Sequence, residues 1–226
     1  QQERTVSRLP QLPHTQTVTY QLSDYQQNAL REIKTHFTNK QVVLLHGVTS
    51  SGKTQLYIQL IQETISEGRQ ALFLMPEIAL TSQMINRLRK VFGNQVGIYH
   101  SKFNDQERIE IWQKVLRGEY KLVLGARSSL FLPFQNLGLL IVDEEHDTSF
   151  KQYDPAPRYH ARDSAIYLAS LFGAKTVLGS ATPSVESYYN AVKLNKYGLV
   201  TLTQRYGNVE PPIIEVVNMR QAAKEN

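Results

Sequence analysis

The sequence has no cysteine among its 226 residues, so it can form neither a disulfide framework nor a thiolate metal site. It also lacks any apolar run near the about 18 residues that a membrane-spanning helix needs. Its richest run, Leu137–Val142, has the length of a strand. The first twenty residues are polar, with Pro10 and Pro13 among them, and show no secretory signal. We therefore expect a cytoplasmic protein that does not contact a membrane.

The composition is that of a folded domain. Hydrophobic residues make up 41% of the chain and charged residues 20%, which is typical of globular proteins. A chain of 226 residues is long enough for one large domain with a sizeable core. The net charge of +5 and the isoelectric point near 9.3 suit a nucleic-acid partner, but many proteins without one are as basic, so the charge is weak support.

Strand-length apolar runs alternate with helix-length amphipathic stretches from Ser23 onward. The runs predict strands at Val42–Leu45, Ala71–Met75, Val96–Tyr99, Leu122–Leu124, Leu139–Val142 and Thr176–Leu178. The stretches between them predict helices at 24–38, 53–66, 79–92, 105–117, 161–172 and 184–194, and Gly68, Gly118 and Gly173 lie just past three of these. This alternation predicts an α/β domain whose mostly parallel sheet is covered by helices on both faces.

The two ends of the chain lack this alternation of strand and helix patterns. We expect residues 1–20 to be a linker or an arm from an upstream domain, and residues 21–205 to form the α/β domain. Residues 206–226 contain Pro211, Pro212 and one short strand candidate, Ile213–Val217. We expect this tail to begin the connection to a further lobe.

The segment Gly47–Thr54 matches the phosphate-binding pattern G-x4-G-K-[ST] in full. It follows an apolar strand and opens a helix, the context in which backbone N–H groups and the helix N-terminus face phosphates. In such a loop Lys53 reaches phosphate oxygens and the Thr54 hydroxyl ligates Mg²⁺. We expect ATP and Mg²⁺ as cofactors, with nucleotide contacts from Gly47, Val48, Thr49, Ser50, Ser51, Gly52, Lys53 and Thr54.

A second acidic site follows the strand Leu139–Val142. There Asp143 is placed to hold the metal, and Glu144 beside it can polarise an attacking water. Taken alone, this doublet reads more simply as a solvated acidic turn after a strand. Paired with a complete phosphate loop, it predicts a catalytic pair, with Glu144 and Lys53 as the catalytic side chains.

The string Asp143-Glu144-Glu145-His146 resembles the DExH box of superfamily 2 helicases, and its DEEH form resembles the PriA (primosomal protein N′) family. Further strings agree in order and spacing: Leu22–Gln26 resembles the adenine-reading glutamine motif, Pro76–Gln83 motif Ia, Gly125–Phe131 the stretch near motif Ib, and Gly179–Ser184 motif III. The resemblance runs from about residue 22 to residue 205 and implies a RecA-like P-loop NTPase fold. The family usually has glycine at position 50 and glutamate at position 55, where this chain has Ser50 and Gln55.

The resemblance also implies roles for single residues. Gln26 would read adenine, although Ser23 three residues earlier makes a capping box an equally physical explanation. His146, Ser180 and Thr182 would couple the nucleotide site to the nucleic-acid site. A metal-ligand role for His146 is disfavoured, because no second histidine stands at ligand spacing.

The segment after the DExH box interleaves aromatic and basic residues in a proline-broken loop, Phe150–Asp163. Rings that stack on bases and cations that meet phosphates hold single-stranded nucleic acid. It resembles the aromatic-rich loop of PriA, and the alternative is a loop that packs on its own domain. We expect DNA contacts from Pro76, Thr81, Arg127, Ser128, Phe150, Lys151, Tyr153, Arg158, Tyr159 and Arg162.

Trp112 is a candidate base-stacking residue, but Ile109, Trp112 and Leu116 share one face of a predicted helix. That spacing favours core packing instead.

The predicted function is hydrolysis of ATP that drives 3′→5′ movement on DNA. The resemblance implies action at stalled replication forks, with single-stranded and forked DNA, primosome proteins and single-strand-binding proteins as partners. It places zinc and a second lobe with an arginine finger in parts of the family protein that this sequence does not contain, so we expect weak turnover from this chain alone. Two alternatives stay open: a P-loop phosphotransferase acting on a small molecule, and a nucleotide- and DNA-binding module without turnover.

Overall fold

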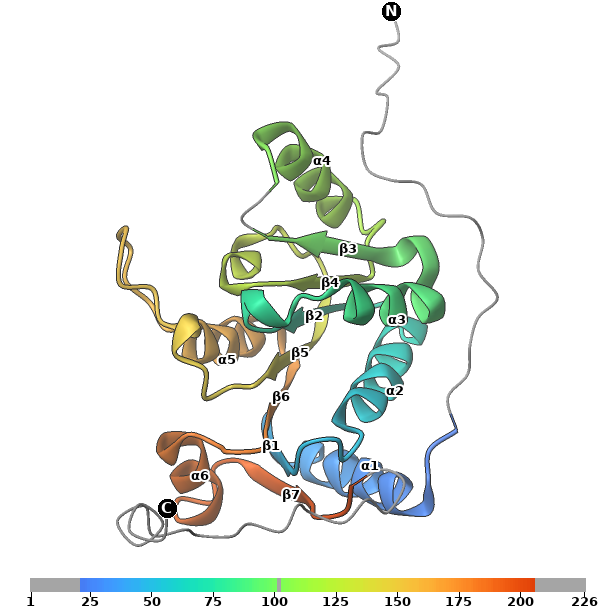
Figure 1. Cartoon of the computed structure of the whole chain (residues 1–226), viewed down its shortest axis with the longest axis vertical. Coiled ribbons are helices and arrows are strands. Elements are labelled where there is room, and N and C mark those ends of the chain that lie inside the picture. The colour runs from blue at the N-terminus through green and yellow to red at the C-terminus, as the bar shows by residue number, and fades with distance from the viewer. Residues whose placement is uncertain (1–20, 101–102, 206–226) are drawn as a thin grey trace, which may run out of the picture.

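A computed structural model describes residues 21–100 and 103–205 of the chain. Their backbone forms one sheet of seven strands in the order β3-β4-β2-β5-β6-β1-β7, and every pair of neighbours is parallel. The strands are β1 (Val42–Gly47), β2 (Gln70–Leu74), β3 (Val96–Tyr99), β4 (Leu122–Gly125), β5 (Leu137–Asp143), β6 (Lys175–Ser180) and β7 (Gly198–Leu202). Because all strands run the same way, their carboxyl ends meet at one edge of the sheet (Figure 1).

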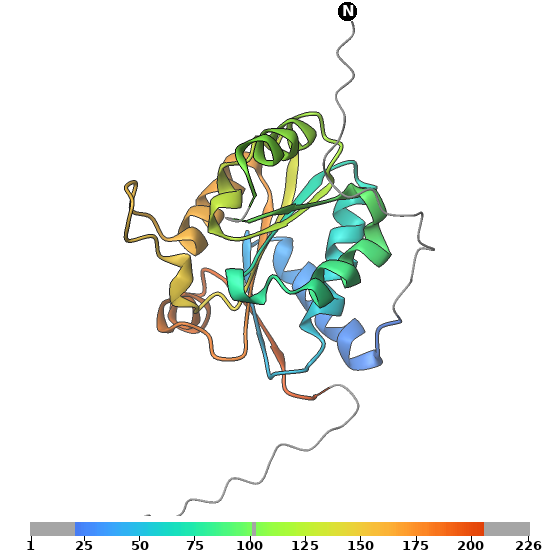
Figure 2. The same cartoon turned by 45° about the horizontal axis from the view of Figure 1, so that its top comes forward.

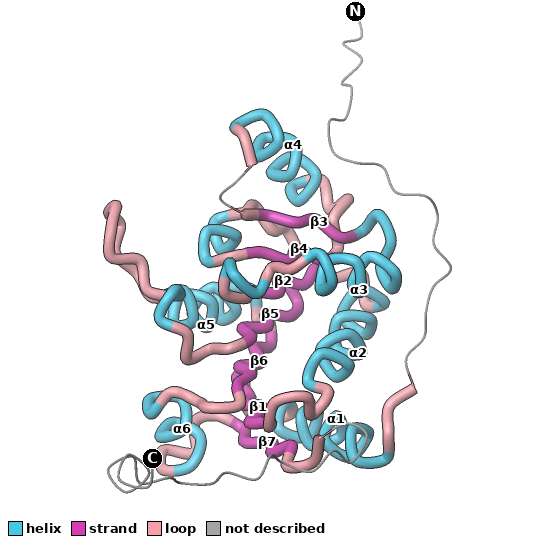
Figure 3. Tube along the Cα trace, viewed as in Figure 1, coloured by secondary structure: helices cyan, strands magenta, loops and turns pink. Residues whose placement is uncertain are grey.

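Helices connect the strands. They are α1 (Asp24–Phe37), α2 (Lys53–Ser66), α3 (Ser82–Phe92), α4 (Asp105–Leu116), α5 (Ala161–Phe172) and α6 (Val185–Val192), with short 3-10 turns η1 (Glu77–Ala79), η2 (Gly93–Gln95), η3 (Arg127–Phe131) and η4 (Thr148–Phe150) (Figure 3). Local sequence sets their starts: Ser23 with Gln26, and Asn104 with Glu107, form capping boxes at α1 and α4. Gly173 ends α5 in the left-handed conformation, at φ 60°, which glycine adopts without strain.

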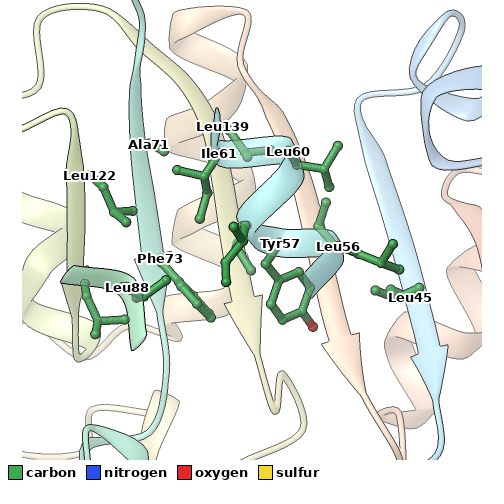
Figure 4. Close-up of a cluster of buried hydrophobic side chains, with 14 of the residues drawn as sticks. Leu45, Leu56, Tyr57, Leu60, Ile61, Ala71, Phe73, Leu88, Leu122 and Leu139 are labelled. Carbon is green, nitrogen blue, oxygen red and sulfur yellow. The ribbon is translucent and has the colours of Figure 1, made fainter. Parts of the chain in front are cut away.

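The helices divide between the two faces of the sheet. One core cluster joins α1, α2 and α3 to alternate residues of the strands, and the other joins α4, α5 and α6 to the residues between them. In Figures 1 and 2 the first three helices lie on one side of the sheet and α5 and α6 on the other. Figure 4 shows the first cluster, where Tyr57 and Leu56 of α2 lie against the strands.

The predicted α/β class with a mostly parallel sheet covered on both faces is confirmed. The six predicted strands and six predicted helices are present, with ends that differ by a few residues. The edge strand β7 was not predicted; it is short, and it becomes a strand by pairing with β1. The predicted strand Ile213–Val217 and the two terminal segments, 1–20 and 206–226, lie outside the described residues.

The prediction that Ile109, Trp112 and Leu116 pack in the core is wrong. These side chains are 56%, 44% and 38% exposed, while Ile111 and Val115 carry the buried face of α4. The helix carries two apolar stripes, one with Ile109, Trp112 and Leu116 and one with Ile111 and Val115. The sequence pattern alone does not determine which of them faces the sheet.

Within residues 21–100 and 103–205, no helix combines the length and the apolar character needed to cross a lipid bilayer.

Candidate nucleotide and nucleic-acid site

Three of the sequence motifs leave neighbouring strands at the carboxyl edge of the sheet. The phosphate-loop segment follows β1, the Asp143–His146 turn follows β5, and the Gly179–Ser184 segment ends β6, which lies between them. Segments that are distant in the chain, following strands that end at Gly47, Asp143 and Ser180, are thereby brought to neighbouring positions. The crevice outside the carboxyl ends of parallel strands is where α/β proteins bind ligands.

The phosphate loop, which we define as residues 47–54, is closed on itself. Lys53 Nζ donates to the Gly47 carbonyl at 2.8 Å, and the Ser51 amide donates to the Val48 carbonyl at 3.1 Å. The Ser51 hydroxyl is buried and has no hydrogen-bond partner. The cap residue Gly52 makes no side-chain hydrogen bond to the first turn of α2, and the N-terminus of a helix favours anions.

Gln26 lies against this loop. Its carboxamide oxygen accepts from the Ser23 amide at 3.1 Å, which completes the predicted capping box. Its amide nitrogen donates to Gln55 Oε1 at 2.7 Å, and a Cβ atom at Gly52 would come within 2.2 Å of that nitrogen. Gln26 is 2% exposed, so both the cap and the loop contact hold it in place. The capping role is confirmed, and adenine recognition stays a prediction.

Asp143 at the end of β5 is 9% exposed and accepts a hydrogen bond from the Tyr57 hydroxyl at 2.9 Å. Burial, and to a smaller extent the nearby Glu144 carboxylate, raise the pKa of Asp143 to about 6, although the Tyr57 hydrogen bond and Lys53 act in the opposite direction. Burial likewise raises the pKa of Tyr57. Gly179 makes room for this pair, since a Cβ there would meet the Tyr57 hydroxyl at 1.7 Å.

These residues fit Mg²⁺ and a nucleotide. The Asp143 carboxylate and the Thr54 hydroxyl are the hard oxygen ligands that Mg²⁺ takes, and the unpaired Ser51 hydroxyl lies in the same loop. In the part of the chain that the structure describes, no group of three or more His, Cys, Asp or Glu side chains could hold a metal ion by itself. A site of one carboxylate and one hydroxyl suits a metal that keeps waters and phosphates as its other ligands.

Glu144 and His146 begin a polar chain that crosses to the Gly179–Ser184 segment. Glu144 has a left-handed backbone, at φ 51°, which is uncommon for a residue with a side chain. Its Oε2 atom lies 3.7 Å from His146 Nδ1, which is 2.8 Å from the Ser180 hydroxyl. Thr182 closes the chain through its amide, which donates to Ser180 Oγ at 2.9 Å, and its hydroxyl, 3.4 Å from His146 Nε2. The residues expected to couple two sites are therefore in mutual contact.

No role is predicted for Glu145 from the sequence, but in the structure its carboxylate accepts four hydrogen bonds. Its side chain is fully buried and accepts hydrogen bonds from Arg162, Ser184 and Ser187. The only sequence signal was a second glutamate directly after a buried strand. That signal does not reveal burial, because the partners come from positions 17 to 42 residues away.

A cavity of about 410 Å³ opens beside the acidic turn. Its lining joins the motif Ia-like segment (Pro76, Glu77), the motif Ib-like segment (Ala126, Arg127, Ser128) and the segment after the DExH box (Ser149, Phe150, Gln152, Pro155), together with Met75, Tyr99, His100 and Arg108. Arg127 crosses between two of these segments, since its Nη1 donates to the Ser149 carbonyl at 2.8 Å. Thr81 lies outside this lining, where it caps α3 by accepting from the Met84 amide.

The segment from Lys151 to His160, which we call the exposed loop, projects from the domain between η4 and α5 (Figures 1 and 2). An antiparallel bridge between Lys151 and His160 closes its base, and the Gln152 side chain donates to the carbonyls of Pro155 and Pro157 at 2.9 and 3.1 Å.

Side chains of the exposed loop differ in how far they reach solvent. Tyr153 is 69% exposed and Arg158 is also exposed, whereas Tyr159 is half-buried, with its ring edge-on to Phe131 at 5.2 Å. Phe131 is itself 63% exposed.

Two of the residues expected at a nucleic-acid surface lie inside the domain instead. Phe150 is 1% exposed and belongs to the core beneath α5. Arg162 is 8% exposed and is paired with Glu145 and Asp163. Both side chains are therefore buried, because the loop leaves the domain only after Phe150 and returns before Arg162, although Phe150 also lines the cavity. Pro76 is buried, yet it lines the cavity.

Comparison with known proteins gives the family. The model of the DEAD/DEAH box helicases matches residues 23–191. The replication restart protein PriA of Bacillus subtilis is 45% identical over 202 residues, which are 88% of this chain and 25% of that protein. PriA of Rickettsia felis is 48% identical over 176 residues, which are 78% of this chain and 27% of that protein. The chain thus spans about a quarter of the length of these curated relatives.

Solved structures agree on the fold. RecG bound to a three-way DNA junction matches 92% of this chain and 27% of that chain, with a TM-score of 0.60 and 22% identity. The UvsW helicase of bacteriophage T4 matches 80% of this chain and 59% of that chain, with a TM-score of 0.53 and 16% identity. At these identities the likeness concerns the fold, and it confirms the RecA-like arrangement. Since the family model spans the phosphate loop, the acidic turn and the Gly179–Ser184 segment, the chain belongs to the DEAD/DEAH box helicase family and is similar within it to the helicase lobe of the PriA proteins.

Proposed function

We propose that this chain is the ATP-binding lobe of an ATP-dependent 3′→5′ DNA helicase that acts in replication restart. One observation carries the proposal: a phosphate loop, an acidic turn and a motif III-like segment lie at neighbouring strand ends, and His146 bonds the last two together. Such direct contact is what a motor needs if events at nucleic acid are to alter hydrolysis. The role in replication restart is supported by the similarity to replication restart proteins, while the direction of movement and the action at stalled forks are what the motif resemblance implies.

On the nucleotide side, Lys53 and the loop 47–54 would bind the phosphates of ATP, and Gln26 would read the adenine. Thr54 and Asp143 would hold Mg²⁺, which neutralises charge on the phosphate oxygens when bound. Glu144 is the half-buried carboxylate beside Asp143, so it would orient the attacking water and accept its proton.

On the nucleic-acid side, the cavity beside the acidic turn and the exposed loop would hold one strand of DNA. Arg127, Ser128 and Pro76 line the cavity, while Tyr153, Arg158 and Lys151 belong to the loop. Exposed rings and cations suit stacking on bases and contact with phosphates. DNA binding at this surface would affect the position of the Glu144 carboxylate through His146, Ser180 and Thr182. Phe150 is retained because, like Pro76, it lines the cavity although it is buried, whereas Arg162 is withdrawn from the DNA contacts because it is buried and paired with Glu145. Thr81 and Tyr159 are retained as secondary contacts.

The setting proposed for the whole protein is the cytoplasm, with single-stranded and forked DNA as partners. Primosome proteins and single-strand-binding proteins would be further partners, and zinc would belong to the remaining length of the family protein. The phosphotransferase alternative is not retained, because the chain belongs to a helicase family. A binding module without turnover stays the second candidate for this chain by itself.

ATP turnover with and without single-stranded DNA tests the proposal. The full-length protein that carries this domain should hydrolyse ATP, and single-stranded DNA should raise the rate severalfold. The Lys34→Ala variant, altered at the opposite edge of the sheet, serves as a control and should behave as the wild type. Turnover that ignores DNA at saturating concentrations would refute the motor function, and nucleotide binding without turnover would favour the binding module.

A further inference from the structure

One fully buried carboxylate, that of Glu145, holds together three segments of the carboxyl edge. Its Oε1 atom accepts from the Ser184 amide at 2.7 Å. Its Oε2 atom accepts from Arg162 Nη1 at 3.1 Å, from the Ser184 hydroxyl at 3.0 Å and from the Ser187 hydroxyl at 2.8 Å. Arg162 also donates to Ser184 Oγ at 2.7 Å, so the two donors are bonded to each other.

Each partner stands next to a functional segment. Glu145 directly follows Glu144, the proposed hydrolytic carboxylate. Arg162 lies in the first turn of α5, two residues after His160, which closes the base of the exposed loop. Ser184 caps α6 and ends the Gly179–Ser184 segment that contains Ser180 and Thr182. A displacement of the loop base therefore reaches Glu145 through a single ion pair.

Stability alone does not explain this arrangement. A buried ion pair loses much of its attraction to the cost of removing both charges from water, and apolar residues of similar volume often serve stability as well. The ion pair instead fixes the orientation of the two side chains relative to each other, because a planar guanidinium and a carboxylate bond in a fixed geometry. Arg162 Nε also donates to Asp163 at 2.8 Å, so the guanidinium orientation is set from two sides.

The turn that carries Glu144 is thus held in place by the contacts of Glu145 and His146, the two residues that follow Glu144. His146 ties it to Ser180, and Glu145 ties it to Ser184 and, through Arg162, to the exposed loop. The Glu145 amide also donates to the Gly179 carbonyl at 3.1 Å, which fixes the backbone of the turn against β6. Glu144 directly precedes these two anchored residues, so a shift of either one would move the backbone that carries its carboxylate.

We propose that Glu145 is a positioning residue that, through Arg162 and Ser184, transmits strand engagement at the exposed loop to the placement of the Glu144 carboxylate. The inference rests on the proposed function, since it concerns how DNA stimulates hydrolysis. It predicts that the ratio of DNA-stimulated to DNA-independent turnover depends on this cluster, although none of its members contacts DNA or nucleotide.

The test uses the full-length protein with Glu145→Gln and Arg162→Gln combined. Changing both leaves no uncompensated buried charge, which a single change would leave. The stimulation ratio should fall by about 5- to 150-fold, the range typical of coupling between two sites. The affinity for single-stranded DNA and the melting temperature should stay close to those of the wild type, because the exposed loop is intact. Ser187→Ala is the matched control: it removes one donor to the same carboxylate, leaves the Arg162–Glu145–Ser184 connection in place, and should keep the ratio.

Other outcomes decide against the inference. A folded double variant with the wild-type stimulation ratio would overturn the inference. A double variant in which DNA affinity, melting temperature and stimulation ratio all decline in parallel would also overturn it, because a purely structural ion pair behaves in that way. If the double variant does not fold, Arg162→Lys keeps the charge but loses the fork geometry. It should give a reduced ratio, and an unchanged ratio in that variant would count against the inference.

Absence of any DNA stimulation in the wild type would refute the proposed function instead. Hydrogen exchange of the same variants then decides the linkage. Amides at the loop base and in the first turn of α6 should exchange faster together in the double variant, whereas faster exchange in α5 alone would overturn the proposed connection.

Discussion

Two loops at the carboxyl edge differ in how they are held. The phosphate loop, residues 47–54, is enclosed: Gln26 lies against Gly52, Lys53 bonds to Gly47, and the Val48 amide donates to the Leu202 carbonyl of β7 at 3.0 Å. The exposed loop, residues 151–160, is bonded mainly to itself and joins the domain only at its base. The phosphate loop is therefore preorganised by its surroundings, whereas the exposed loop extends its side chains into solvent.

The difference matches the ligands proposed for the two loops. Phosphate groups are small and identical in every nucleotide, so a fixed cradle of N–H groups binds them without further ordering cost. A single strand of DNA is long and varied, and exposed rings accept any base by stacking. In the proposed function the two loops communicate through the acidic turn, where His146 contacts Ser180 and Glu145 is paired with Arg162.

The largest effect should come from the carboxylate between the two loops. Glu144→Gln should retain Mg-ATP binding, because metal ligation is assigned to Asp143 and Thr54, but turnover of the full-length protein should fall by about 10²–10⁴-fold, as for the loss of a general base. Steady-state ATPase measurements check this. Glu186→Gln, which alters an exposed glutamate in the first turn of α6, should leave turnover unchanged. Turnover of Glu144→Gln within a few-fold of the wild type would remove Glu144 from the catalytic role.

The enclosed loop should be sensitive to the loss of its one cation. Lys53→Ala should weaken Mg-ATP binding by about 10- to 150-fold, which corresponds to the about 1.5–3 kcal/mol of a hydrogen bond to a charged group. The fold should survive, since the hydrogen bond that the Lys53 side chain makes is to the loop's own Gly47 carbonyl. Calorimetric titration with Mg-ATP and a melting curve check the two parts. A well-folded variant with unchanged affinity would contradict the assignment of this loop.

Much of the enclosed loop's setting could be predicted because it is local. The phosphate pattern, the strand before it and the helix after it are contiguous, and so are the acidic turn and the segment Gly179–Ser184. Alternating strands and helices then imply a parallel sheet, and a parallel sheet brings the strand ends together. The sequence therefore predicted both the fold and the meeting of these segments.

Burial at the exposed loop and around it could not be predicted in the same way. Phe150 and Arg162 belong to one aromatic and basic stretch with Tyr153, yet they are buried and Tyr153 is not. Which members turn inward depends on Glu145 and on the core beneath α5, both set by distant segments. For the same reason Trp112 was placed in the core, and the contact between Gln26 and Gln55 went unnoticed.

Two tyrosines of the exposed loop allow the contribution of a ring to DNA binding to be measured separately from its contribution to packing. Tyr153→Ala should lower the affinity for single-stranded DNA by about 1 kcal/mol, or about 5-fold, at the low end of the range for base stacking because binding costs an exposed side chain its rotamer freedom. Its melting temperature should not change, since the ring is 69% exposed. Tyr159→Ala should lower both, because that ring contacts Phe131 and the core.

Tyr167, which is 67% exposed on α5, provides the control for this pair. Its replacement by alanine should alter neither DNA binding nor melting temperature. Fluorescence titration with a labelled oligonucleotide measures the affinities. Wild-type affinity in Tyr153→Ala would leave the exposed loop without the stacking role that distinguishes it from the enclosed loop.

The smallest effect tests how strongly the enclosed loop is held. Ser50 has φ 63°, in the left-handed region that costs a residue with a side chain about 1–2 kcal/mol relative to glycine. Ser50→Gly removes that cost, but it also adds freedom to the unfolded chain worth about 0.4–1 kcal/mol. We therefore expect a net stabilisation of about 0.5–1 kcal/mol, seen as a rise in melting temperature of about 1–4 °C for a domain of this size. Ser66→Gly makes the same change in composition at the last residue of α2, where helical geometry gives glycine no advantage, and it should lower the melting temperature instead. If both variants melt lower than the wild type, the left-handed backbone at Ser50 stores no strain, and the phosphate loop is held less tightly than its contacts imply.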